Sequence, residues 1–281
     1  MDNVVKVEFE NDDLFDVEPI YKEFDGFGEA EEEKKKESRV DAFASTEEVN
    51  AFVKYFLDKR DYRTAFFVVL GCNTDLRPTD LLEYRWEHIF DGKKCKTQHY
   101  KKERKTRKIK FISLNRAVVE MAWLYRNYLG EDYKEDKFCF ASFGPNKSHT
   151  PLGQRRTDPK KRIYTITEQP MNVRSFARIL RGAAKDLGLY RDNRRISTYS
   201  LRKTALNAPI GFVHGVEVDK EAIEMLKRAE ISMIMGNHSK ISTTLDHYTP
   251  VKEYIMQKTF ESMNLGLEAI LEHKEEIGWS C

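Results

Sequence analysis

The sequence predicts a mainly α-helical protein with one small antiparallel β-sheet, an α+β fold. Apolar residues recur at helical spacing through most of the chain after residue 45, which is typical of helices with one buried face. One lysine-rich stretch, residues 93–114, instead alternates as paired strands do. The 281 residues suffice for one large domain or two small ones, and 40 % hydrophobic residues are adequate for a buried core.

Three helices are expected in the first part of the ordered chain. In STEEVNAFVKYFLDKR (45–60), Ser45 and Glu48 form a capping box, and apolar residues follow at helical spacing. RTAFFVVLGCN (63–73) is apolar almost throughout and predicts a second, mostly buried helix. PTDLLEYRW (78–86) restarts a helix, because proline suits the first helical turn.

The strand-like stretch predicts a short antiparallel ribbon, in which Ile109 and Phe111 alternate with lysines. A helix follows, with Asn115 as its cap and Gly130 as its stop. Residues 141–170 are rich in proline and glycine and predict a basic loop or a small second ribbon. Further helices are expected at about 171–187, 199–213, 219–235 and 251–271.

Charge is distributed unevenly along the chain. Residues 1–40 hold 14 acidic and 6 basic side chains, a net charge of −8; since the whole chain carries +2, residues 41–281 carry +10. We therefore expect an acidic, flexible N-terminal arm over 1–40 and one basic domain over 41–281. A basic domain suits a polyanionic partner, with the arm competing for the same surface, but a solvated tail beside an ordinarily charged domain accounts for the charges equally well.

Several classes of protein are disfavoured by composition. No apolar run approaches the roughly 20 residues of a membrane span, and the acidic N-terminus does not resemble a signal peptide. We therefore expect a cytoplasmic protein without a membrane partner. The scattered cysteines form no CxxC pair, which argues against a zinc site or a disulfide framework; they are Cys72, Cys95, Cys139 and Cys281.

Two arginines, a histidine and a tyrosine stand out in sequence order. Arg77 lies in DLRPTDLL and Arg202 in YSLRKT, both where a helix is expected to begin. A planar guanidinium binds two phosphate oxygens at once. His238 and Tyr248 follow in GNHSKISTTLDHYTP (236–250). Because a phenol titrates near pH ~10, Tyr248 needs surrounding positive charge if it acts as a nucleophile.

These segments, in this order, resemble the motifs of the tyrosine recombinase family, the phage-integrase group. DLRPTDLL is similar to the GLR-x-x-E-L box, with Asp80 at the acidic position. KTRKIKFISL is similar to the lysine ribbon of the family and places the family's lysine at Lys105. YSLRKT is similar to the H-x-L-R-x-T box, and NHSKISTTLDHYTP to the box that carries the histidine and the nucleophilic tyrosine.

The resemblance covers roughly residues 45–265 and implies the tyrosine recombinase catalytic-domain fold. It implies cleavage and rejoining of double-stranded DNA without a metal ion or another cofactor. Tyr248 would form a 3′-phosphotyrosine, Arg77, Arg202 and His238 would hold the phosphate oxygens, and Lys105 would protonate the leaving 5′-oxygen. The family also implies self-association, as a tetramer on paired DNA sites, and no small-molecule substrate.

The sequence departs from the family pattern at several places. Tyr199 stands where the family usually has a histidine, and a phenol is a far weaker base near neutral pH. Asn237 replaces the glycine before His238, and Pro250 replaces the usual residue after the nucleophile. The family commonly has an N-terminal helical clamp, whereas only about 44 residues, with a net negative charge, precede the expected catalytic part here.

A second group of basic residues is expected to contact backbone phosphates and not to perform chemistry. The group consists of Lys101, Lys102, Arg104, Lys108, Arg155, Arg156, Lys160, Lys161, Arg194 and Arg195. The other histidines show no metal-ligand spacing, and His247 is expected to face solvent or to pack; the others are His88, His99, His149, His214 and His273.

Two further functions share these residues. A sequence-specific DNA-binding protein, such as a phage repressor, could retain the recombinase fold without cutting, which Tyr199 and the missing clamp favour. A type IB topoisomerase-like enzyme would share the chemistry, although the residues of these sequence motifs fit that class less well. The retained set, which favours the recombinase, is Arg77, Lys105, Arg202, His238 and Tyr248.

Overall fold

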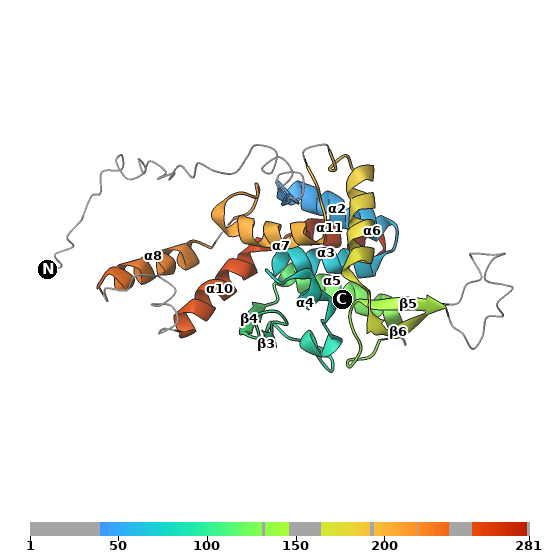
Figure 1. Ribbon diagram of the computed structural model, residues 1–281, viewed down its shortest axis with the longest axis horizontal. Helices are drawn as coiled ribbons and strands as arrows, with labels where there is room; N and C mark the ends of the chain where they lie inside the picture. Colours follow the sequence, from blue (N-terminus) through green and yellow to red (C-terminus); the bar gives the residue numbers. More distant parts are fainter. Residues whose placement is uncertain are drawn as a thin grey trace, which may run out of the picture. The chain divides into compact units, whose positions relative to one another are not determined.

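The helix α3 (Tyr62–Asn73) is buried, and four helices pack against it: α2 (Thr46–Asp58), α4 (Pro78–Leu82), α5 (Arg116–Leu129) and α7 (Thr198–Asn207) (Figure 1). The computed structural model describes residues 40–130, 133–145, 164–191, 194–217, 219–235 and 249–279. They belong to one compact unit, residues 40–281. Its helices are α2 (Thr46–Asp58), α3, α4 (Pro78–Leu82), α5 (Arg116–Leu129), α6 (Val173–Asp186), α7 (Thr198–Asn207), α8 (Lys220–Met235), α10 (Thr249–Met263) and α11 (Leu267–Glu276), with 3₁₀ turns η1 (Trp86–His88) and η4 (Ala208–Ile210).

The prediction of a mainly helical protein with antiparallel strand pairs is confirmed, but the described strands form three two-stranded sheets and not one. β3 (Gln98–Lys102) pairs with β4 (Ile109–Ser113), which confirms the lysine-rich ribbon. β5 (Ala141–Pro145) pairs with β6 (Tyr164–Pro170), so the second ribbon, and not a loop, is present there. The third sheet joins β1 (Phe90–Asp91) to β2 (Lys94–Cys95).

Local signals placed several helix ends correctly. The Ser45 hydroxyl accepts the Glu48 N–H at the start of α2, and the Asn115 side chain accepts the Val118 N–H at the start of α5. Gly130 ends α5 with a φ of 54°, a left-handed value that glycine adopts without strain. The predicted starts and stops of these helices are therefore confirmed.

The helix expected over 78–86 is shorter than predicted. α4 ends at Leu82, and the chain then runs extended, so that Cys139 N–H donates to the Tyr84 carbonyl and Trp86 N–H to the Lys137 carbonyl. This route buries the side chains of both Tyr84 and Trp86. Burial of two large aromatic rings outweighs continuation of a helix by one or two turns.

The helix expected over 251–271 is two helices. α10 ends at Met263, and Gly266 adopts a φ of 86° before α11 begins. Buried Asn73 accepts the Leu265 N–H at 2.9 Å and donates to the Leu265 carbonyl at 2.8 Å. The Asn115 amide also donates to Asn73, at 2.7 Å. A side chain at the end of α3 therefore satisfies the backbone where the helix breaks.

The strand alternation predicted around Ile109 holds only in part. Ile109 is 74 % exposed, whereas Phe111, Ile112 and Ser113 are all buried. α10 packs against β4, so this end of the strand is covered on both faces. The helices that the structure describes include none long and apolar enough to cross a bilayer.

Candidate active site

Arg77 lies at the end of the extended segment that joins α3 to α4. Its backbone is extended, with φ −68° and ψ 149°, and its carbonyl accepts the N–H groups of Asp80 and Leu81 as α4 begins. Pro78 occupies the first position of α4, where a missing N–H costs nothing. The local sequence therefore holds Arg77 rigidly at a helix start, as the motif predicts.

The Arg77 guanidinium is paired with Glu103 from the ribbon. Nη1 donates to Glu103 Oε1 at 2.6 Å, and the two side chains are 24 % and 11 % exposed. The other oxygen of Glu103 accepts the Thr106 hydroxyl. Burial alone would raise the pKa of Glu103, but the hydrogen bonds from Thr106 and Arg77 outweigh it, so the pKa lies below its usual value.

Asp80 lies beneath the turn of the ribbon and is completely buried. Its Oδ1 accepts the Arg104 N–H at 3.0 Å, while Oδ2 has no hydrogen-bond partner in the described part of the chain. Two carboxylates, those of Asp80 and Glu103, thus join the ribbon turn to the Arg77 segment. The sequence indicated Asp80 through its motif, but Glu103 carries no motif signal.

The basic residues of the ribbon fall into two groups. Lys105 lies in the turn and is exposed, as are Lys102, Arg104 and Lys108. Lys101 is only 9 % exposed, and its ammonium lies 5.1 Å from the centre of the Tyr84 ring. Burial lowers the pKa of Lys101. Four of the five are therefore available to a phosphate, and Lys101 packs inward because its strand position faces the core.

Lys110 contacts the Arg77 segment, although sequence reasoning did not select it. Its ammonium pairs with the Asp75 carboxylate and lies 3.5 Å from the Asp75 carbonyl. It also lines a cleft between the ribbon and α10, together with Tyr100, Glu253 and Met256. Nothing in the local pattern separates Lys110 from its neighbours, since only the fold brings Asp75 to it.

Arg202 and Tyr199 lie one turn apart on α7. Ser197 is the N-cap of this helix, and its N–H donates to the Ser200 hydroxyl at 2.9 Å. Tyr199 is 51 % exposed. Arg202 is half-buried, and its Nη1 is buried without a hydrogen-bond partner among the described residues. An unpaired buried guanidinium nitrogen costs about 1–3 kcal/mol, more for a charged group, unless an anion satisfies it.

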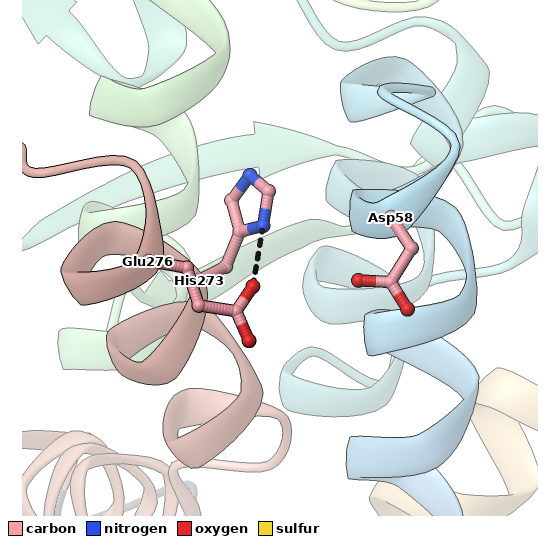
Figure 2. A group of neighbouring side chains, drawn as sticks. All are labelled: Asp58, His273 and Glu276. Atoms are coloured by element: carbon pink, nitrogen blue, oxygen red, sulfur yellow. Dashed lines mark ion pairs between the residues drawn. The ribbon is translucent and has the colours of Figure 1, made fainter.

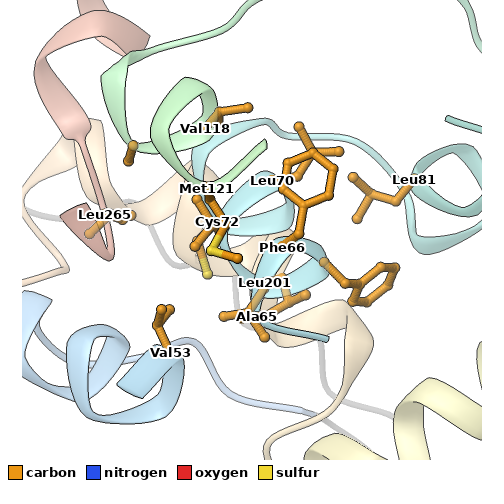
Figure 3. Close-up of a cluster of buried hydrophobic side chains, with 14 of the residues drawn as sticks. Val53, Ala65, Phe66, Leu70, Cys72, Leu81, Val118, Met121, Leu201 and Leu265 are labelled. Atoms are coloured by element: carbon orange, nitrogen blue, oxygen red, sulfur yellow. The ribbon is translucent and has the colours of Figure 1, made fainter. Parts of the chain in front are cut away.

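α4, which begins directly after Arg77, and α7, which carries Arg202, meet at one point of α3. A methyl group at Gly71 would lie 2.7 Å from Cδ1 of Leu201 and 3.3 Å from Cδ1 of Leu81. Leu201 precedes Arg202, and Leu81 lies one turn after Arg77. Figure 3 shows both leucines in the buried cluster of hydrophobic side chains. The absence of a side chain at Gly71 therefore lets α4 and α7 both pack closely on α3.

Comparison with known proteins gives a match to the model of the phage integrase family over residues 43–210. The chain belongs to the phage integrase family. A search of the curated proteins finds no match. A structure search aligns the chain with the crystal structure of XerA recombinase, with a TM-score of 0.40 and 12 % identity, over 87 % of this chain and 66 % of that chain.

The family match includes Arg77, Lys105, Tyr199 and Arg202 and ends before His238 and Tyr248. His238 and Tyr248 also lie outside the described residues, as do four of the predicted phosphate contacts, Arg155, Arg156, Lys160 and Lys161.

The described chain resumes immediately after Tyr248 with α10, which packs against β4 of the integrase-family ribbon. Tyr100 on β3 donates to the Glu253 carboxylate on α10, at 2.9 Å from either oxygen. α8 and α10 lie side by side (Figure 1). The helix that follows the candidate nucleophile is therefore anchored to the lysine-bearing ribbon.

Arg194 and Arg195 were predicted to contact phosphates; the structure pairs the side chain of Arg194 with Glu48 and the backbone of Arg195 with Asp41. Arg194 forms two bonds to Glu48, one of them from Nη1 to Oε1 at 2.6 Å. Burial alone would raise the pKa of Glu48, but Arg194 lowers it below its usual value. The Arg195 carbonyl accepts the Asp41 N–H at 2.8 Å, and the Arg195 N–H donates to the Asp41 carboxylate at 2.9 Å. These contacts hold the segment before α7 against the start of α2.

Proposed function

We propose that this integrase-family protein is a site-specific recombinase that cuts and rejoins double-stranded DNA without a metal ion. The observation that most supports the proposal is the buried Nη1 of Arg202, which has no hydrogen-bond partner in the described part of the chain. It lies on a helix that shares its packing point on α3 with the helix after Arg77. Arg77 uses Nη1 for Glu103 and retains other N–H groups for a phosphate. Two guanidinium groups suit the charge of a pentacoordinate phosphorus.

In the proposed reaction, Tyr248 attacks the phosphorus of a DNA phosphodiester, and its phenolic proton passes to solvent water. The bond from phosphorus to the 5′-oxygen breaks, leaving a 3′-phosphotyrosine and a free 5′-hydroxyl. Arg77, Arg202 and His238 stabilise the non-bridging oxygens, and Lys105 donates the proton that the leaving oxygen takes up. A second 5′-hydroxyl then attacks the phosphotyrosine, which rejoins the strand without ATP.

Covalent capture tests this proposal. Duplexes that bind the full-length protein are selected from a random-sequence pool, nicked near the centre of the site and incubated with protein. A denaturing gel then reports any DNA–protein adduct. We expect an adduct that is absent in Tyr248→Phe and retained in Tyr254→Phe, a matched change on α10. Tight, sequence-specific binding without an adduct would instead establish the non-cutting DNA-binding protein.

The identity of the general acid is tested separately. Lys105 is exposed in the ribbon turn, whereas Lys110 pairs with Asp75 beside the Arg77 segment. A substrate with sulfur in place of the leaving 5′-oxygen needs no proton, because a thiol is far more acidic than an alcohol. We expect this substrate to restore cleavage by Lys105→Ala. If this substrate restores cleavage by the Lys110→Ala variant and not by the Lys105→Ala variant, then Lys110 is the donor of the proton to the leaving oxygen.

We further propose that the protein is cytoplasmic, takes no small-molecule substrate and assembles as a tetramer on paired sites. Exposed apolar side chains at the end of α7 and in the segment after it support self-association: Leu206, Ile210 and Phe212 are 47 %, 65 % and 68 % exposed. Sedimentation with and without the selected duplex tests the assembly. The acidic arm, residues 1–40, is proposed to compete with DNA, so its deletion should strengthen binding.

A further inference from the structure

Three side chains with metal-binding atoms converge where α11 packs against α2. Asp58 is the last residue of α2, and His273 and Glu276 lie on successive turns of α11 (Figure 2). One ligand atom from each residue lies within 4.8 Å of the other two. Asp58 and Glu276 are exposed, while His273 is buried at 5 % exposure. None of the three belongs to the candidate active site.

The buried histidine points to a missing partner. His273 Nε2 lies 3.2 Å from the Tyr62 hydroxyl, whereas Nδ1 is buried and makes no hydrogen bond within the described residues. The Glu276 carboxylate is 3.8 Å from Nδ1, which is too long for a hydrogen bond. A ring protonated at Nε2 donates to the Tyr62 oxygen and leaves the Nδ1 lone pair directed at the two carboxylates.

We propose that Asp58, His273 and Glu276 bind a divalent transition-metal ion, with zinc as the best fit. One imidazole and two carboxylates match the ligands that zinc accepts. Tyr62 supplies the outer hydrogen bond that fixes the tautomer of a metal-binding histidine. Exposure of both carboxylates leaves room for a water molecule in the fourth position.

The distances are compatible with this ion after small side-chain movements. Zinc–nitrogen and zinc–oxygen bonds of ~2.0–2.2 Å place the ligand atoms of a tetrahedral site roughly 3.4 Å apart. The 3.8 Å between His273 and Glu276 is close to that value. All three ligand atoms lie within 4.8 Å of one another, and rotation of the exposed carboxylates would bring them to the shorter distances of a zinc site.

Lys54 is a positively charged group that opposes metal binding. Its ammonium lies 3.0 Å from Glu276 Oε1 and 3.8 Å from Glu272 Oε2. The ion would use the other oxygen of Glu276, Oε2, so the two contacts are compatible in space. The positive charge of Lys54 nevertheless weakens affinity, so its removal should tighten binding several-fold.

Titration of the full-length protein with zinc, after removal of bound metal by a chelator, tests the site. Calorimetry should give one ion per chain, and saturating zinc at 100 times the dissociation constant should raise the melting temperature by roughly 5–10 °C. Asp58→Asn and Glu276→Gln should each abolish the shift. Glu272→Gln is the matched control, since it also pairs with Lys54 but lies outside the group, and it should retain the shift.

Two further experiments test the site without a melting temperature. Cobalt spectra report the type of ligand atom, and a Lys54 variant reports the effect of the neighbouring charge on zinc affinity. Cobalt in place of zinc should give visible absorption bands without the near-ultraviolet band of thiolate ligands, which distinguishes this site from the cysteines. Lys54→Met should bind zinc more tightly than the natural protein. The proposal is overturned if zinc does not bind, or if binding is unchanged in both Asp58→Asn and Glu276→Gln. Neither outcome depends on DNA cleavage.

Discussion

Replacing Glu103 by glutamine should loosen the connection between Arg77 and the ribbon. In the natural protein one oxygen of Glu103 accepts from Arg77 at 2.6 Å, and the other accepts from Thr106. Glutamine retains the size and one acceptor oxygen of glutamate but loses the negative charge. The change therefore removes the ion pair while leaving the space filled.

The size of the effect follows from burial. Exposed ion pairs contribute about 0.2–1 kcal/mol, whereas loss of one partner of a fully buried pair costs about 3–5 kcal/mol. The Arg77 and Glu103 side chains are 24 % and 11 % exposed, which lies between those limits. Because glutamine keeps part of the hydrogen bonding, we expect Glu103→Gln to lower the free energy of unfolding by about 1–2 kcal/mol, or Tm by roughly 3–6 °C.

Urea unfolding at pH 7 measures this cost. Glu83→Gln is the control, because Glu83 pairs with Arg104 at 3.2 Å but the two side chains are 37 % and 70 % exposed. The free energy of unfolding of Glu83→Gln should lie within about 0.5 kcal/mol of the value for the natural protein. A double-mutant cycle of Glu103→Gln with Arg77→Met should show coupling; additivity within about 0.3 kcal/mol would refute the reasoning.

The same pair predicts the direction of a pH effect. The pKa of Glu103 in the folded protein lies below its usual value, because the bonds from Thr106 and Arg77 outweigh burial. A depressed pKa gives stabilisation that is fully present above the unfolded value of about 4.3 and is lost as pH falls through the folded value. The difference in stability between natural protein and Glu103→Gln should therefore be constant from about pH 5 to 7 and shrink below about pH 4.

Three other changes probe the packing and the charge of the same unit. Asn73→Ala leaves several buried hydrogen-bonding groups unpaired, so urea unfolding should show a loss of about 3–4 kcal/mol in the free energy of unfolding. The control is Asn172→Ala, which removes an exposed helix cap and should cost about 1 kcal/mol. Gly71→Ala should destabilise by about 1–2 kcal/mol and reduce adduct formation at least tenfold, because the new methyl group would lie 2.7 Å from a side chain of α7. At Gly182 an added methyl group would meet no described atom within 4 Å apart from its chain neighbours and the backbone of its own helix. Gly182→Ala should therefore instead stabilise by about 0.5–1 kcal/mol. Lys105→Ala should reduce the slope of log affinity against log salt concentration by about 1 in a DNA-binding titration; an unchanged slope would remove Lys105 from the phosphate contacts.

The sequence by itself determined the elements whose signals are local. The caps of α2 and α5 depend on side chains within three residues of the helix start. Ser45 and Asn115 could therefore be predicted as N-caps from the local sequence alone. The pairing of β3 with β4 followed from strand-like alternation across a short turn. The order of Arg77, Lys105 and Arg202 likewise indicated the family, because each lies in a short motif.

Only the tertiary structure decided which distant groups meet. The break before α11 depends on Asn73, which no pattern near Leu265 reveals. The pairing of Lys110 with Asp75 and of Arg77 with Glu103 arises because α3 carries the arginine segment to the ribbon. Asp58 reaches His273 and Glu276 only because α11 packs on α2. Capping and periodicity act over a few residues, whereas these contacts depend on how helices pack, which is set by the whole core.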